Sequence, residues 1–222
     1  MEIQKVYSFL RDLRENNNRE WFAASKSRYV EVKKIVDDVA ETMIAAVAAV
    51  DADAARLTPA DCTYRIYRDT RFSADKTPYK THIGVFVNPP TGKKGITCGY
   101  YLHIEPDNTL FAAGTIGHPS DVLKAIRQSV YDEIEEYRSI VEDPEFRRLF
   151  PVVGDSPLKT TPKGFPKDWE HIEYLKPRNF IAEGPIEETL ICRGDLVQIL
   201  DPYIRQAFRF NRFMNFTIED FI

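Results

Sequence analysis

The sequence predicts an α+β fold: a mainly antiparallel sheet of at least four strands, with an N-terminal helical hairpin and further helices packed on it. Apolar residues recur at helical spacing through residues 1–55, alternate with polar ones through residues 60–115, and return to helical spacing within residues 116–222. The connections between the alternating segments are short and rich in turn-forming residues. This favours antiparallel pairing, because parallel strands need long crossovers. Since no linker or internal repeat separates these parts, we expect a single domain over residues 1–222.

The first part of the chain is predicted to form the helical hairpin. Its first helix carries the apolar residues from Val6 to Leu13 and ends at the polar run Asn16–Asn18. Asn17, followed three residues later by Glu20, has the form of a capping box that would open the second helix. The apolar residues from Tyr29 to Val50 alternate gaps of three and four, which predicts one helix face packed on a sheet or on another helix.

The middle part is predicted to supply the sheet, and the last part the remaining helices and surface loops. The predicted strands are Cys62–Phe72, His82–Val87, Thr97–Glu105 and Thr109–Ala113. The predicted helices are one long helix from Val122 to Val141, a short helix near Trp169–Leu175 and a final helix from about Leu196 to Phe213. The proline- and lysine-rich stretch between them, Pro151–Pro166, is expected to run over the surface.

Composition restricts the class of protein. A formal net charge of -4 argues against a general nucleic-acid or membrane binder, because both need a broad basic surface. The three cysteines are far apart in the sequence and none belongs to a CxxC element, which favours a reduced, cytoplasmic setting. The N-terminus resembles no signal peptide, and the longest apolar run, Met43–Val50, is too short to span a bilayer. We therefore expect a cytoplasmic protein without a membrane segment or a cofactor.

The segment Arg65–His82 has the most unusual composition in the chain. It holds five lysines and arginines but only two carboxylates, Asp69 and Asp75, within an acidic protein. Remote acids, solvent or a ligand must balance the excess, and arginines with lysines suit phosphate or carboxylate recognition. The alternative is a network of ion pairs in which the two aspartates anchor the strand. The predicted ligand-binding residues are Arg65, Arg68, Asp69, Arg71, Lys76, Tyr79 and Lys80.

Arg68 occupies a special position in the predicted strand. A period of two places it on the face shared with Tyr64, Ile66 and Phe72, while the other two arginines lie on the opposite face. An arginine on an apolar face must find a carboxylate or a bound anion. We therefore expect the five cations of the segment to converge on one anion-accepting pocket next to the third strand.

His103 is the candidate catalytic residue. It shares a strand face with Tyr101 and Glu105, so the carboxylate could orient the imidazole as a general base or as one ligand in a larger metal cluster. The alternative is a half-buried histidine bonded to a neighbouring strand residue. The four histidines lack ligand spacing, so no tightly bound metal is expected.

In these segments, taken in order, the chain resembles the domain of unknown function 2461 family, a set of uncharacterised, mostly bacterial proteins. The resemblance implies a single-domain bacterial protein and no particular activity. One departure is His118, which stands where an aromatic residue is more usual. The matching blocks are Phe9–Leu10, Asn16–Phe22 with Lys26 and Tyr29, Arg65–Ser73, Asp75–Lys80, Gly99–Ile104 and Pro162–Phe165.

Two functional hypotheses follow from the residues. The leading one is a domain that binds or acts on a small anionic or phosphorylated molecule at the basic segment, with catalysis left open. The alternative is a non-catalytic interaction module that binds an acidic protein surface or nucleic-acid phosphates. A deep pocket lined by the basic residues and His103 favours the first, and a flat or convex cluster favours the second.

Overall fold

The structure, a computed structural model that describes residues 2–89 and 91–221, is an α+β fold with one five-stranded sheet. Every neighbouring pair of strands is antiparallel, and the strand order is β1-β2-β3-β5-β4. The strands are β1 (Ile83–Val87), β2 (Gly99–Ile104), β3 (Leu110–Gly114), β4 (Val152–Asp155) and β5 (Asn179–Pro185). The α-helices are α1 (Ile3–Glu15), α2 (Arg19–Ala24), α3 (Lys26–Ala48), α4 (Pro59–Cys62), α5 (Ser120–Asp132), α6 (Ile134–Val141), α7 (Pro144–Leu149), α8 (Glu188–Arg193) and α9 (Leu196–Ile218).

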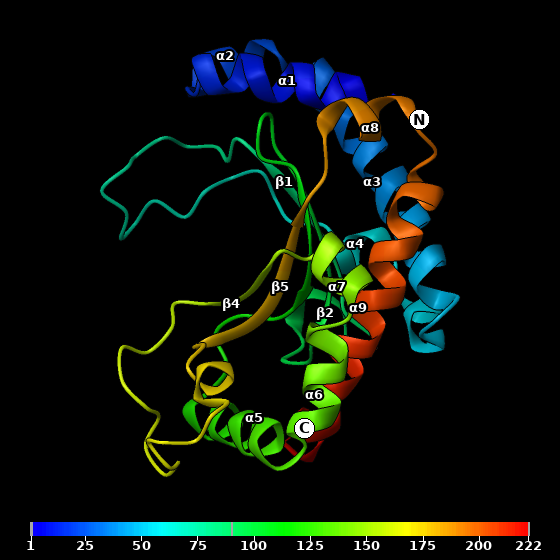
Figure 1. Ribbon diagram of the computed structural model, residues 1–222. Helices are drawn as coiled ribbons and strands as arrows, with labels where there is room; N and C mark the ends of the chain where they lie inside the picture. The colour runs from blue at the N-terminus through cyan, green and yellow to red at the C-terminus, as the bar shows by residue number, and fades with distance from the viewer. Residues whose placement is uncertain (1, 90, 222) are drawn as a thin grey trace.

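The helices of the described residues cover one face of the sheet. In Figure 1, α3, α6, α7 and α9 lie to one side of the strands, while the loop before β1 and the loop after β4 project to the other side. Side chains at alternate strand positions, such as Val85, Leu102 and Phe111, belong to the hydrophobic core beneath these helices. Their neighbours point to the opposite face, which none of the described helices covers. This arrangement confirms the predicted fold class and leaves one sheet face free to form a site.

Two asparagines of α9 join the helix layer to the sheet. The Asn211 side chain, only 3% exposed, accepts a hydrogen bond from Gly114 N–H (2.8 Å) and donates one to Gly99 C=O (2.9 Å). Asn215 bonds both backbone groups of Cys98 in the same way. Because Gly99 and Gly114 are the paired end residues of β2 and β3, these amides satisfy backbone groups where the ladder stops.

The N-terminal helices occur where the sequence predicts them, but the predicted cap is wrong. Asn18, not Asn17, caps α2, because its side chain accepts a hydrogen bond from Trp21 N–H at 2.9 Å. Asn17 lies one residue earlier and bonds a distant loop instead. The segment predicted as one second helix also divides at Ser25 into α2 and α3.

The largest error concerns the predicted strand Cys62–Phe72. Cys62 ends α4, and residues 63–82 form a loop held by two isolated bridges, Thr63 with Val85 and Tyr67 with Tyr79. The alternation of this segment is one of charge, and it supplies no continuous apolar face that a sheet could bury. Ile66 is buried, whereas Phe72 is 96% exposed. The other three predicted strands are confirmed as β1, β2 and β3.

The C-terminal part contains more sheet than the sequence predicts. Pro151–Pro166, expected as a surface run, contains β4, and neither β5 nor α8 is predicted from the sequence. The predicted long helix is α5 followed by α6, which break at Glu133, where φ is -113° and ψ is 42°. The short helix near Trp169–Leu175 is a 3-10 turn over Ile172–Leu175, and the final helix is confirmed as α9. None of the described helices combines the length and the apolarity needed to cross a membrane.

The Asn211 amide is expected to carry a measurable part of the stability. Asn211→Ala leaves the Gly99 carbonyl and the Gly114 N–H buried without partners, which should lower the free energy of unfolding by about 2 to 6 kcal/mol. Urea denaturation measures this change. Asn16→Ala is the control, because that exposed side chain bonds only its own helix, and equal losses in both variants would contradict the assignment.

Candidate functional site

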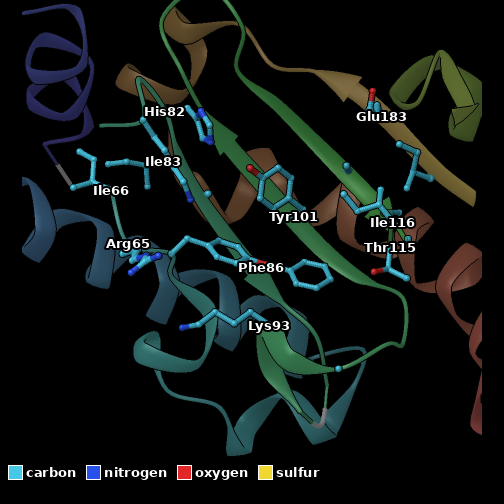
Figure 2. A pocket seen from close by; sticks show the side chains of 18 residues that line it. Arg65, Ile66, His82, Ile83, Phe86, Lys93, Tyr101, Thr115, Ile116 and Glu183 are labelled. Atoms are coloured by element: carbon cyan, nitrogen blue, oxygen red, sulfur yellow. The ribbon is translucent and has the colours of Figure 1, made fainter. Parts of the chain in front are cut away.

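A cavity of about 490 Å³ lies on the face of the sheet that the helices leave uncovered. Its floor is built by β1, β2, β3 and β5, and its wall by the loop of residues 63–82, here called the basic loop. Figure 2 shows Phe86 and Tyr101 projecting from the sheet between Arg65 on one side and Glu183 on the other. The cavity therefore combines an aromatic floor with charged groups at its edges.

The strand register accounts for the shape of the floor. Phe86, Tyr101, Ala112 and Glu183 face one another across four neighbouring strands. The Tyr101 ring lies over Gly84, where an added Cβ would stand 2.7 Å from the ring Cε2 and from the hydroxyl oxygen. A glycine at this position is thus required for Tyr101 to lie flat along the sheet.

Tyr101, His103 and Glu105 form a hydrogen-bonded chain along β2. The Tyr101 hydroxyl lies 2.9 Å from His103 Nδ1, and His103 Nε2 lies 3.1 Å from Glu105 Oε2. Burial alone would raise the pKa of Glu105, but hydrogen bonds from Asn108, His103 and Thr81 outweigh burial and hold that pKa below its usual value. The ionised carboxylate only accepts, so His103 Nε2–H donates to it. In the neutral imidazole, Nδ1 then accepts from the tyrosine.

His82 stacks on His103, with ring centroids 4.5 Å apart and an interplanar angle of 29°. Burial, and then the nearby charge of His103, lower the pKa of His82 to about 4. Nitrogen and oxygen atoms of His82, His103 and Glu105 all lie within 4.8 Å of one another. Within residues 2–89 and 91–221, this is the group of histidines and acids that could hold a metal ion. The sequence identified His103 and Glu105 but missed His82.

The basic loop is fastened to the N-terminal helices through Tyr79. The Asn17 side chain donates to Tyr79 C=O (2.9 Å) and accepts from Tyr79 N–H (3.1 Å). The Tyr79 ring stacks on Phe22 with centroids 4.0 Å apart. Tyr79, predicted as a ligand-binding residue, is buried in this contact. Its visible role is to hold the loop beside the cavity.

The cations of the basic loop divide into two groups. Arg68 donates to Asp75 and to Thr77. Arg71 bonds Asp69, and Lys76 donates to Thr70 C=O at 2.8 Å. The predicted placement of Arg68 on an apolar strand face is wrong, because the segment is not a strand. For these residues the geometry matches the alternative of ion pairs along the loop, so the structure does not bring all five cations together.

Arg65 and Lys80 form the second group, and both line the cavity. In the described part of the chain neither has an ion-pair partner, and Asp69 is already bonded to Arg71. Burial, and then the charge of Arg65, lower the pKa of Lys80. Lys93, from the 3-10 turn Gly92–Lys94, also lines the cavity and donates to Thr63 C=O at 2.8 Å. The sequence did not identify Lys93 as a site residue.

Positive charge is concentrated on the side of the open face. Residues 63–82, 91–98 and 156–178 together hold twelve of the 30 lysines and arginines but only five of the 34 acids. The first and third of these segments project away from the helix layer in Figure 1, and the second carries Lys93. The remaining chain holds eighteen cations and twenty-nine acids. The protein is therefore acidic overall but basic on the side of the open sheet face.

Comparison with known proteins gives one result. The sequence model of a protein family described as conserved hypothetical protein (DUF2461) matches residues 5–213, which is most of the chain. No curated protein and no solved structure matches.

The contact between Gly84 and Tyr101 can be tested with a double-mutant cycle. Gly84→Ala should destabilise the protein by about 1 to 3 kcal/mol, because the new methyl group collides with the tyrosine ring. In a Tyr101→Ala background the same substitution should be nearly neutral. Urea denaturation of the four proteins measures the coupling, and an equal cost in both backgrounds would show that the ring lies elsewhere.

Asp75 should titrate at an unusually low pH. Its pKa is lowered from 3.8 to about 2 by the Thr77 N–H, then by the Arg68 guanidinium and the Thr77 hydroxyl. Because the folded pKa is below the unfolded one, these contacts stabilise the loop above about pH 4 and are lost as the pH falls toward 2. A pH titration followed by carboxyl NMR should show a higher pKa for Asp75 in Arg68→Ala than in the wild type, and an unchanged pKa in Arg71→Ala. A midpoint unaffected by Arg68→Ala would refute the pairing.

Proposed function

We propose that this chain, which belongs to the DUF2461 family of conserved hypothetical proteins, binds a small anionic or phosphorylated molecule in the cavity on the open sheet face. The observation that carries the proposal is the pair Arg65 and Lys80, two neighbouring cations that line the cavity without an acidic partner in the described chain. Two like charges held near each other repel, and a bound anion would replace that repulsion with two attractions.

The two side chains suit different parts of such a ligand. A guanidinium binds a phosphate or carboxylate through two parallel hydrogen bonds, while an ammonium acts as a point charge that adapts its position. Lys80 Nζ lies 5.5 Å from the centre of the Tyr64 ring, which holds the amine near the cavity. The basic side of the molecule would further attract an anion over longer distances.

The volume of the cavity favours a small molecule over a macromolecule. Pockets for small ligands usually occupy roughly 300 to 1,000 Å³, and a cavity of about 490 Å³ lies within that range. Phe86 and Ile181 offer apolar contacts for a carbon skeleton, and Tyr101 and Glu183 offer polar contacts at the floor. The ligand class is therefore an organic anion with a polar body.

His103 has an indirect place in this proposal. Tyr101 lines the cavity, whereas His103 lies two residues farther along β2 and touches the Tyr101 hydroxyl. His103 would orient Tyr101 rather than meet the ligand. The proposal accordingly assigns it a positioning role and makes no claim about a reaction.

Binding experiments with matched variants test the proposal. A thermal-shift screen with inorganic phosphate, pyrophosphate, sugar phosphates and nucleotides should find at least one stabilising compound. A ligand at a hundred times its dissociation constant adds about 2.7 kcal/mol of apparent stability. Arg65→Ala and Lys80→Ala should each weaken binding of that compound in calorimetry. Arg71→Ala, which removes a cation of the same loop that is paired with Asp69, should bind normally.

Two outcomes would contradict the proposal. One is the absence of binding by any of these anions. The other is binding of an oligonucleotide or an acidic peptide that weakens in Arg71→Ala and not in Arg65→Ala. Since Arg71 and the exposed Phe72 are adjacent in the basic loop, that result would favour the interaction module.

A further inference from the structure

We infer that His82, His103 and Glu105 form a binding site for one divalent transition-metal ion at the edge of the cavity. The sequence argued against a metal because the histidines lack ligand spacing along the chain. The strand register removes that argument. Ile83 pairs with Ile104, and Gly84 pairs with His103, so His82 and Glu105 stand at the same end of neighbouring strands.

The donor atoms are already close to the separation that a metal ion requires. Zinc bonds of about 2.0 to 2.2 Å in a tetrahedral shell place neighbouring donor atoms roughly 3.3 Å apart. His103 Nε2 and Glu105 Oε2 are 3.1 Å apart, and donor atoms of all three residues lie within 4.8 Å of one another. To complete the shell, the His82 nitrogen would move closer to the other two donor atoms, which already lie within 4.8 Å of it.

The surrounding hydrogen bonds are those that orient metal ligands. Thr81 donates to Glu105 Oε1 at 3.1 Å, and Asn108 donates to Oε2 at 3.0 Å. Behind His103, the Tyr101 hydroxyl lies 2.9 Å from Nδ1. Ligand histidines usually hold a hydrogen bond at the nitrogen that does not bind the metal, and this bond fixes the ring orientation.

Metal binding at His103 requires only a change of tautomer. The ion takes the position of the Nε2 proton, and the imidazole carries its proton on Nδ1 instead. Nδ1–H then donates to the Tyr101 oxygen over the same short contact. The imidazole stays neutral and the carboxylate stays ionised, so no proton is lost from the site.

The donor set indicates the kind of ion. Two imidazoles and one carboxylate favour zinc, iron, cobalt or nickel over magnesium and calcium, which prefer oxygen ligands alone. Three protein ligands leave at least one coordination position open.

Because His82 lines the cavity, an ion held by it would add positive charge beside Lys80 and Arg65. The inference rests on the β1–β2 contacts and stands independently of the proposed anion site.

Direct metal titration tests the inference. Protein without a polyhistidine tag, dialysed against a chelator and then buffer, should bind one Zn²⁺ per chain in calorimetry, and Co²⁺ should give visible d–d absorption bands. His82→Ala, His103→Ala and Glu105→Gln should each abolish this stoichiometric binding. Tyr101→Phe should keep the stoichiometry and weaken the affinity by about tenfold or more, as expected for loss of a supporting hydrogen bond.

His171→Ala is the matched control, because that half-buried histidine packs against Trp169 and Tyr174 and lies outside the cluster. Circular dichroism establishes that each variant is folded. If a histidine variant unfolds, Glu105→Gln provides the test instead, because the glutamine side chain has nearly the same size and shape as glutamate. Absence of stoichiometric binding by the wild type would overturn the inference. Equal binding by Glu105→Gln, or equal loss in His171→Ala, would do the same. Arg65→Ala should keep the metal, so failure of the anion site and failure of the metal site give different results.

Discussion

The structure depends on one constraint, the attachment of a single helix layer to a single face of an antiparallel sheet. The Asn211 side chain in α9 holds the two layers together, because it forms hydrogen bonds with backbone groups at the paired ends of β2 and β3. Once that face is covered, alternate residues of each strand meet opposite environments. Val85 and Leu102 enter the core, while Phe86 and Tyr101 are left on the uncovered side. The cavity is thus a consequence of the layering, and the basic loop encloses it because Asn17 and Phe22 hold Tyr79 in place.

The sequence predicted those elements whose periodicity reflects burial. Gly99–Ile104 alternates between the core and the open face, and the predicted strand Thr97–Glu105 agrees with it to within two residues at each end. Cys62–Phe72 also alternates with a period of two, but its charged residues form ion pairs along a loop. The alternation in this segment therefore does not reflect burial of one strand face. The sequence did not predict β5, because its apolar run Phe180, Ile181 and Ala182 is too short to distinguish a strand from a helix.

The candidate site could be predicted by composition but not by geometry. The sequence identified the basic segment and the chain from Tyr101 to Glu105. It could not show that Arg68 and Arg71 find local acids, which leaves Arg65 and Lys80 as the pair at the cavity. Nor could it place His82 on His103, since that contact depends on the register between β1 and β2, which the sequence does not specify. Pairing along a loop and register between strands are both set by tertiary packing.

The two proposed sites share a physical argument. Arg65 and Lys80 lie near each other without an ion-pair partner in the described chain, and burial followed by the charge of His103 lowers the pKa of the stacked His82. Both arrangements lie on the uncovered face, and both become favourable when a charge of the appropriate sign arrives: an anion between Arg65 and Lys80, and a cation between His82, His103 and Glu105. Elsewhere in the protein, cations such as Arg138 and Arg205 pair with acids one helical turn away. The cavity, the two neighbouring cations and the cluster of histidines and glutamate occur together on this face, and that coincidence is the physical reason for proposing it as the functional one.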